Sequence, residues 1–446
     1  MKEQQHIFTN KMLRTLLIPV IFEQVLNSLM GTVDTMMVSN VGSAAISAVS
    51  LVDSINVLVI QAFSALAAGG AILCSQYIGQ KNHEMANKSA RQVLFIITAI
   101  SVAVTALCLL FRVPLLKLIF GKVEADVMTA SQVYFFYTAL SFPFIALYDA
   151  GASIFRSQGN TRGPMTVSVI SNVINIGGNA ALIWGFNMGV AGAAIATVFS
   201  QGVSAILCYI YMMRRFDILK TTPAERKFDG ALARIQMYIG VPMGLQFSIT
   251  AIGSIMLQSA NNALGTACVA AFTAAMRIKM FFMCPFESLG MAMATYSGQN
   301  YGAGKPERIW MGVKASTLMM IVYWAFTFCV LMFGARTFVL LFVDASELEI
   351  LKNTELFLHI SVSFFPVLGL LCILRYTIQG VGYTNLAMLS GVSEMIARIL
   401  VSLLAVPAFG YLAVCFGDPT AWIFADAFLI PAFIYVYRRI LRMKKN

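Results

Sequence analysis

Two short stretches half a chain apart decide how this sequence is organised: SQYIGQKN (Ser75–Asn82) and GQNYGAGK (Gly298–Lys305). Gln76 and Gln299 are 299 − 76 = 223 positions apart, which is half of the 446-residue chain. The same offset aligns Pro19 with Pro242, Gly42 with Gly265, Ala48 with Ala271, Phe142-Pro143 with Phe365-Pro366, and Gly159, Thr161 and Met165 with Gly382, Thr384 and Met388. One ungapped register over most of each half indicates an internal duplication.

The composition is typical of a membrane protein. Hydrophobic residues make up 59% of the chain, charged residues only 11%, and the mean hydropathy is +0.78. A soluble domain carries roughly 25% charged residues, so this chain lacks the side chains to cover a soluble surface. Apolar runs of about 20 residues, the length of a membrane-spanning helix, recur from end to end. Because they lack the alternation of barrel strands, we expect an all-α polytopic membrane protein.

The apolar runs predict twelve transmembrane helices in two six-helix lobes. They lie near residues 13–38, 44–74, 90–118, 128–154, 163–187, 190–213, 236–262, 266–297, 311–341, 349–379, 386–410 and 419–441. The longest polar interruption, Arg214–Gln236, predicts an N-terminal lobe (1–213), a cytoplasmic linker (214–235) and a C-terminal lobe (236–446). Since six is even, both lobes enter the membrane from the same side, and the internal repeat is parallel.

The net charge of +11 reflects membrane topology rather than a partner. When the loops are assigned to alternate sides, most Lys and Arg lie on the side of the two termini and the central linker. The opposite side holds only Arg112, Lys117, Lys122, Arg336 and Lys352. This positive-inside bias predicts a multi-pass protein of the cytoplasmic (inner) membrane with both termini in the cytoplasm. We expect no nucleic-acid partner.

The motifs resemble those of the MATE (multidrug and toxic compound extrusion) transporters over essentially the whole chain. The resemblance is carried by TVDTMMVSNVGSAAISAVS (Thr32–Ser50), SQYIGQKN, FRSQGNTRGPM (Phe155–Met165), GVAGAAIATVFSQ (Gly189–Gln201) and GQNYGAGKPERI (Gly298–Ile309). It implies a secondary active transporter that exports organic, often cationic, drug-like compounds in exchange for H⁺ or Na⁺ by alternating access. Such transporters commonly place the substrate between their two repeats.

Two carboxylates lie on one face of the first predicted span. Glu23, Asn27, Met30 and Asp34 follow at spacings of four, three and four, so Glu23 and Asp34 are three turns, about 16 Å, apart. Ionisable groups within spans are costly, and we expect this face to line a cavity. A carboxylate there can be neutralised by a proton, Na⁺ or a cationic drug, which is the competition that antiport requires. Asp53 is a further cavity acid; the alternative is a structural, hydrogen-bonded role for these acids.

The resemblance also implies a cation-coupling site in the first lobe. Asp34 stands where the family keeps an aspartate, which in many members joins an Asn, an Asp and a Thr of the fifth and sixth helices. Asn175 and Thr197 match, but Asn179 stands where many members have Asp. Asn can ligate Na⁺ but cannot bind a proton, so the coupling ion stays open, and transported Na⁺ at Asp34 is the only metal expected. The alternative is that Asn172, Asn175 and Asn179 join helices through amide hydrogen bonds.

The second lobe breaks the symmetry of the repeat. Glu23 maps to Gln246 and Asp34 to Leu257, so the seventh span has no matching carboxylate. Glu394 and Arg398 are four residues apart in the favourable order for an ion pair. The residues of this lobe that we expect in a polar network are Gln246, Arg277, Glu287, Arg375, Glu394 and Arg398. The sequence leaves the partners of the two arginines Arg277 and Arg375 open.

Other ionisable residues are weaker candidates. Asp149 and Asp426 are expected near a membrane interface, and Glu355 and His359, four residues apart, are expected to pack together. The eight cysteines are scattered singly and the three histidines are dispersed, so we expect neither disulfides nor a resident metal or cofactor.

Two rival classes of function remain. Flippases of lipid-linked oligosaccharides share the two-lobe plan and use a basic cavity, and Arg277, Lys279, Arg375 and Arg398 keep this alternative open. An enzyme is not expected, because the sequence contains no H-E-x-x-H or G-x-S-x-G motif. We expect a monomer.

Overall fold

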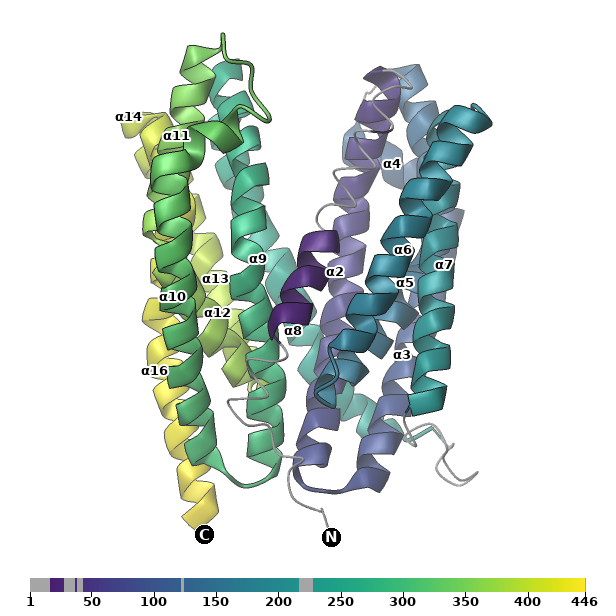
Figure 1. Cartoon of the computed structure of the whole chain (residues 1–446), viewed down its shortest axis with the longest axis vertical. Helices are drawn as coiled ribbons and strands as arrows, with labels where there is room; N and C mark the ends of the chain where they lie inside the picture. The colour runs from purple at the N-terminus through teal and green to yellow at the C-terminus, as the bar shows by residue number, and fades with distance from the viewer. Residues whose placement is uncertain (1–16, 28–36, 38–42, 122–123, 216–227, 446) are drawn as a thin grey trace. The chain divides into compact units, whose positions relative to one another are not determined.

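The computed structural model describes residues 17–27, 37, 43–121, 124–215 and 228–445, and the regular structure in these ranges is helical (Figure 1). Ten helices in the described ranges are long and apolar enough to cross a membrane. The pair Leu348–Ser363 and Phe365–Gly380, bent by 50°, adds an eleventh span. The helix Leu17–Asn27 begins the predicted first span, much of which lies outside the described residues. The prediction of an all-α polytopic membrane protein is confirmed.

The chain divides into two compact units, here called the N-terminal unit (residues 18–244) and the C-terminal unit (residues 245–446, with the residues up to Leu17). The N-terminal unit contains α2 (Ser43–Gly79), α3 (His83–Leu110), α4 (Arg112–Phe120), α5 (Ala125–Ser157), α6 (Arg162–Asn179), the π-helix η2 (Ala180–Gly185) and α7 (Gly189–Arg215). The division falls within α8 (Gly230–Asn262), at Gly244, whereas the sequence predicted a linker at 214–235.

The C-terminal unit contains the second half of α8 and nine further helices. They are α9 (Thr266–Gly302), α10 (Pro306–Val339), α11 (Leu348–Ser363), α12 (Phe365–Gly380), α13 (Thr384–Leu400), the π-helix η5 (Val401–Ala405), α14 (Val406–Phe409), α15 (Tyr411–Cys415) and α16 (Gly417–Lys445). In this unit α12 packs against α9, and α13 packs against α16.

The helix boundaries repeat at the offset that the sequence predicted. α2 and α9 start 266 − 43 = 223 residues apart and end 302 − 79 = 223 residues apart. α3 and α10 start at the same offset, as do α5 and α11. The extensive α2–α5 packing of the N-terminal unit recurs as α9–α12 packing in the C-terminal unit. The core repeats as well: Phe63 and Phe142 meet edge-on with centroids 6.1 Å apart, and their equivalents Phe286 and Phe365 meet at 5.4 Å.

The repeated stretches Ser75–Asn82 and Gly298–Lys305 end two long helices. Lys81 and Gly304, which are equivalent, both adopt a left-handed backbone, with φ of 59° and 65°. The backbone N–H of Asn82 then reaches the Tyr77 carbonyl at 3.0 Å, and the N–H of Lys305 reaches the Asn300 carbonyl at 2.9 Å. This pattern of bonds satisfies carbonyls that a helix end leaves open. The sequence repeats itself because both repeats turn from one span to the next in the same way.

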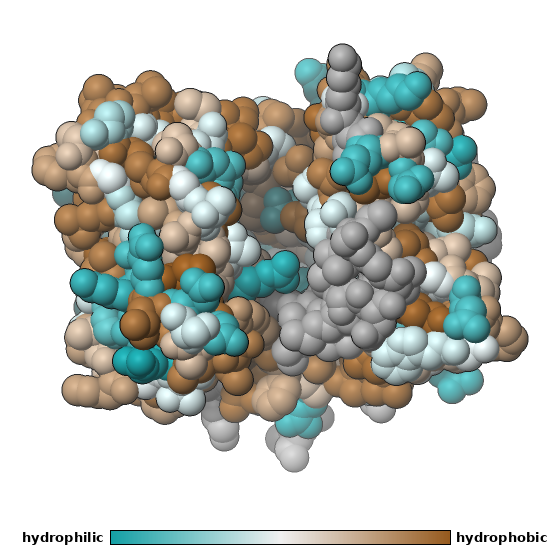
Figure 2. Space-filling model, turned by 90° about the horizontal axis from the view of Figure 1, so that it is seen from above, coloured by the Kyte–Doolittle hydropathy of each residue, from teal (hydrophilic) through white to brown (hydrophobic). Residues whose placement is uncertain are grey.

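The outer surface is suited to lipid. Large apolar side chains are widely exposed, among them Phe333 at 90% and Leu118 at 85%. Figure 2, which looks onto one end of the molecule rather than onto its sides, shows apolar residues interspersed with groups of polar ones. Exposed apolar surface of this extent marks contact with membrane or partners, and here it belongs to helices of membrane-spanning length.

Candidate functional site

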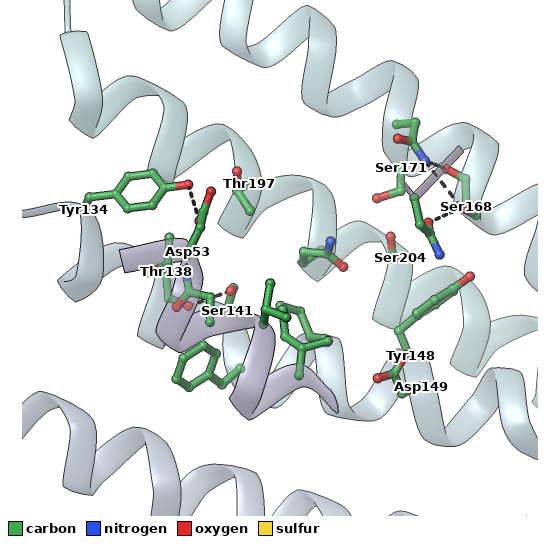
Figure 3. A pocket seen from close by; sticks show the side chains of 18 residues that line it. Asp53, Tyr134, Thr138, Ser141, Tyr148, Asp149, Ser168, Ser171, Thr197 and Ser204 are labelled. Atoms are coloured by element: carbon green, nitrogen blue, oxygen red, sulfur yellow. Dashed lines mark hydrogen bonds between the residues drawn. The ribbon is translucent and has the colours of Figure 1, made fainter. Parts of the chain in front are cut away.

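The N-terminal unit contains a pocket of about 340 Å³ within its helical bundle (Figure 3). Its lining comes from the helix Leu17–Asn27 and from α2, α5, α6 and α7. Polar residues on these helices and an apolar wall formed by Val57, Ile60, Phe142 and Ile145 share the surface. Two lining residues, Asp53 and Asp149, carry carboxylates, and the described lining includes no Lys, Arg or His. The pocket is therefore suited to a cation with apolar groups.

Asp53 lines the pocket from α2, as the sequence analysis expected of a cavity acid. Tyr134 donates its hydroxyl to Asp53 Oδ1 at 3.3 Å, and Asn56 donates Nδ2 to the same oxygen at 3.4 Å. These donors hold the carboxylate against α5 at one end of the view in Figure 3.

The predicted amides and hydroxyl of the cation-coupling site come together. Asn179 Nδ2 donates to Asn175 Oδ1 at 3.2 Å, and Asn175 Nδ2 donates to Thr197 Oγ1 at 3.3 Å. Both Asn side chains are 0% exposed, whereas Thr197 also lines the pocket. Asp34 lies outside the described residues, so this chain of three side chains is the described part of the predicted site. Whether these residues bind a cation remains a prediction.

Asn172 and Asn27 lie on the pocket wall instead. Asn172 Nδ2 donates to the Ser168 carbonyl at 2.8 Å, and Ser168 Oγ donates to Asn27 Oδ1 at 3.0 Å. These bonds connect α6 to the helix Leu17–Asn27 along the side of the pocket. Of the three Asn residues of α6, Asn175 and Asn179 therefore belong to the chain with Thr197, and Asn172 belongs to the pocket wall.

Glu23, the other predicted acid of the first span, is buried and ion-paired. Its side chain is 1% exposed, and Arg156 Nη2 of α5 approaches Glu23 Oε1 at 2.8 Å. Tyr148, also on α5, donates its hydroxyl to the same oxygen at 3.0 Å. Asn27, one turn further on, reaches the pocket lining, but Glu23 lies behind Tyr148.

The C-terminal unit contains a buried chain of alternating charges. Glu394 of α13 pairs with Arg375 of α12 and, at 3.4 Å, with Arg398 Nη1. Arg398 Nε also donates to Asp418 Oδ1 of α16 at 2.9 Å, and Asp418 pairs with Lys279 of α9. This chain joins four helices and contains three cations and two anions.

Of the other residues predicted for this polar network, one joins the chain of charges and two do not. Gln246 is 2% exposed, and its amide lies 2.9 Å from Gln379 Nε2 and 3.2 Å from the Arg375 guanidinium, so it joins the chain. Arg277 and Glu287 are exposed, and neither forms an ion pair with a described residue. Sequence reasoning missed Asp418, because the position of this acid at the start of α16 gives no hint of its partners on α9 and α13.

Metal-binding clusters are not found in the described ranges: no group of three or more His, Cys, Asp or Glu side chains gathers there to hold an ion. Glu355 and His359 were expected to pack together; Glu355 Oε1 and His359 Nε2 are both buried, and neither has a hydrogen-bond partner among the described residues.

Fold and pocket together define a two-repeat helical membrane transporter. The MatE family model matches residues 19–181 and again 242–404, two segments 242 − 19 = 223 residues apart. The chain belongs to the MATE family, whose members are transporters rather than enzymes.

Individual relatives agree with this assignment. The probable multidrug resistance protein YoeA of Bacillus subtilis is 26% identical to this chain, over 70% of each sequence. The FAD transporter of Shewanella oneidensis is 23% identical, over 76% of this chain and 75% of its own. The crystal structure of MATE in complex with MaL6 has a TM-score of 0.90 at 20% identity, over 98% of this chain and 97% of that one.

Proposed function

We propose that this protein exports organic, often cationic, compounds in exchange for H⁺ or Na⁺ by alternating access. The observation that carries the proposal is the pocket of the N-terminal unit, which combines the carboxylates of Asp53 and Asp149 with an apolar wall and no basic residue in its described lining. An organic cation needs both features, a counter-charge and apolar surface. The names of relatives such as the probable multidrug resistance protein YoeA support the same substrate class.

Cation coupling is assigned to Asp34 with Asn175, Asn179 and Thr197. The amide and hydroxyl oxygens of the last three are hard ligands of the kind that alkali and alkaline-earth cations prefer. Of the four side chains, only that of Asp34 carries a group that can gain and lose a proton in water. Na⁺ would therefore use the whole group and H⁺ would use Asp34. Entry of either cation repacks the N-terminal unit and weakens substrate binding, so that the two occupants exchange.

The same proposal places the protein in the cytoplasmic membrane as a monomer with both termini in the cytoplasm. The orientation of the termini rests on the positive-inside bias of the loops and on the even number of spans.

A lipid-linked flippase is the alternative function. It requires a basic cavity for a diphosphate headgroup, which the sequence attributed to Arg277, Lys279, Arg375 and Arg398. Three of these four cations, Lys279, Arg375 and Arg398, are paired with Glu394 and Asp418, so two of their three positive charges are compensated. This argues for the organic-cation exporter.

Efflux of ethidium from proteoliposomes tests the proposal, with a proton gradient and a Na⁺ gradient imposed separately. We expect one gradient to drive efflux by the wild type and neither to drive efflux by Asp34→Asn. Asp126→Asn is the matched control, because Asp126 is an exposed residue outside the pocket. Gradient-driven efflux by Asp34→Asn at the wild-type rate would contradict the site, and no efflux by folded wild type would contradict the function.

A further inference from the structure

Asp149 is an acid of the pocket that the proposed coupling site does not use. It lies on α5 in the pocket wall and accepts a hydrogen bond from Ser64 of α2, 85 residues earlier in the chain. Within the described part of the chain, Asp149 forms no ion pair. A carboxylate inside a membrane-spanning bundle with only a hydroxyl as direct partner is costly as an anion, so it needs a cation or a proton.

Among the residues that the structure describes, the one nearby cation is already paired with another acid. Arg156 lies two turns after Asp149 on α5, about 10 Å along the helix axis, and pairs with Glu23 at 2.8 Å. In the described ranges, Arg156 and Glu23 are the charged groups that act on Asp149, and Tyr148 and Cys208 are its other titratable neighbours. One guanidinium cannot balance two carboxylates. When both acids are ionised, this group of Glu23, Arg156 and Asp149 carries one net negative charge.

That charge faces the pocket rather than the protein interior. Glu23 is 1% exposed and lies behind Tyr148, whereas Asp149 is itself part of the lining. Among the described residues, Arg156 forms its ion pair with Glu23 and none with Asp149. Asp149 is therefore the member of this charged group whose carboxylate a ligand in the pocket can reach.

Asp149 and Asp53 lie at opposite ends of the pocket. Asp149 is bonded to Ser64, and Ser64 is eleven residues, or three turns, after Asp53 on the continuous helix α2, about 16 Å along its axis. Figure 3 shows the same separation, with Asp53 beside Tyr134 on one side and Asp149 beside Tyr148 on the other. A substrate cation at one end is too far from the other carboxylate to contact both through one charged group.

We propose that Asp149 is a second cation-binding residue of this pocket, which holds the charged group of an organic cation when substrate is present and a proton when the pocket is empty. Binding of one monovalent cation releases one proton to the solvent of the pocket, so the charge of the site is unchanged. This assignment rests on the proposed function as an exporter of organic cations. It adds a substrate-linked proton that is separate from the coupling ion at Asp34.

Ethidium binding to the purified full-length protein in detergent, measured by fluorescence without any gradient, tests the assignment. The charge of ethidium is fixed, so a pH dependence reports the protein. We expect wild-type affinity to fall as the pH is lowered, because protons compete. Asp149→Asn should bind about tenfold more weakly or worse and lose most of this pH dependence. Asp126→Asn, the same change at an exposed position of α5, should bind as the wild type does.

Ser64→Ala is the second variant, since it keeps the carboxylate and removes its hydroxyl donor. It should still bind ethidium, but protons should compete more strongly, so that half of the binding is lost at a higher pH. If Asp149→Asn does not fold, an unchanged pH midpoint in Ser64→Ala overturns the proposal. If Asp149→Asn binds ethidium with the affinity and pH profile of the wild type, only the assignment of Asp149 is overturned. If the wild type fails to bind ethidium at any pH, the organic-cation function is overturned as well.

Discussion

At the scale of single residues, Lys81 and Gly304 give the clearest comparison between the two repeats. They hold the same left-handed position, yet only glycine adopts it without strain from a Cβ atom. A Cβ built at Gly304 meets no heavy atom within 4 Å, so strain is the main consequence of a side chain there. We expect Lys81→Gly to raise and Gly304→Lys to lower the free energy of unfolding, each by about 1 kcal/mol.

The measurement is the midpoint of thermal unfolding of the purified protein in one detergent. Lys81→Ala serves as the control, because it removes the charged side chain but keeps the strained backbone, and it should unfold near the wild-type temperature. Shifts of the same sign in Lys81→Gly and Gly304→Lys would show that backbone strain is not the cause.

Glu394 is the residue on which the buried charge chain of the C-terminal unit depends. It is 3% exposed and lies between Arg375 and Arg398. Removing one partner from a buried ion pair leaves an uncompensated charge, which costs about 3–5 kcal/mol. We therefore expect Glu394→Gln to lower the thermal midpoint strongly, measured by loss of monodisperse protein after heating.

Glu349→Gln is the matched control, since Glu349 is an exposed residue of α11 in the same unit. It should unfold as the wild type does. Equal midpoints for Glu394→Gln and Glu349→Gln would mean that the charge chain contributes little to stability.

At the scale of helices, the repeated Phe-Pro pair has two outcomes. Pro143 lies inside the continuous helix α5, whereas Pro366 follows the break between α11 and α12, which is bent by 50°. A proline removes the hydrogen bond to the carbonyl four residues earlier. Both of these carbonyls are bonded from another helix: Thr105 Oγ1 donates to Ala139 at 3.2 Å, and Trp324 Nε1 donates to Val362 at 2.9 Å.

The indole N–H of Trp324 should therefore stabilise the break. Trp324→Phe keeps an aromatic ring but leaves the Val362 carbonyl without this donor, at an expected cost of about 1–3 kcal/mol. Trp310→Phe is the control, because Trp310 is 39% exposed and stacks on Phe433 with no hydrogen bond from its indole among the described residues. The measurement is the midpoint of thermal unfolding, which should fall more in Trp324→Phe than in Trp310→Phe. A drop of the same size in both variants would mean that the lost ring contacts, not the hydrogen bond, cause the effect.

The contrast between these prolines also shows what sequence alone can predict. Span length, hydropathy and the 223-residue register are local or additive properties, so helix type, repeat and most boundaries followed from them. The break at Phe364 did not, because the Val362 carbonyl beside it is bonded by Trp324 of another helix. The same limit applies to the site: Asn175 and Asn179 share a face by spacing, but the contacts of Asp149 with Ser64 and of Arg398 with Asp418 depend on how helices are rotated against one another.

At the scale of the whole molecule, the two repeats share a backbone plan but differ in charge. The described pocket of the N-terminal unit presents two carboxylates without a basic residue, whereas the C-terminal unit buries three cations with two anions in one internal chain. Since most of the buried charge of the C-terminal unit is used in ion pairs, we infer that cation exchange belongs to the N-terminal unit.

The distribution of basic residues predicts how the whole chain is oriented. With both termini in the cytoplasm, green fluorescent protein fused after Asn446 should fluoresce, and alkaline phosphatase at the same position should be inactive, because the phosphatase folds only outside the cytoplasm. A phosphatase fused after Gly121, between α4 and α5, should be active, since Arg112, Lys117 and Lys122 belong to the side that carries few basic residues. Active phosphatase at Asn446 together with inactive phosphatase at Gly121 would reverse the orientation. The direction in which the pocket opens at each stage of export would then have to be assigned the other way round.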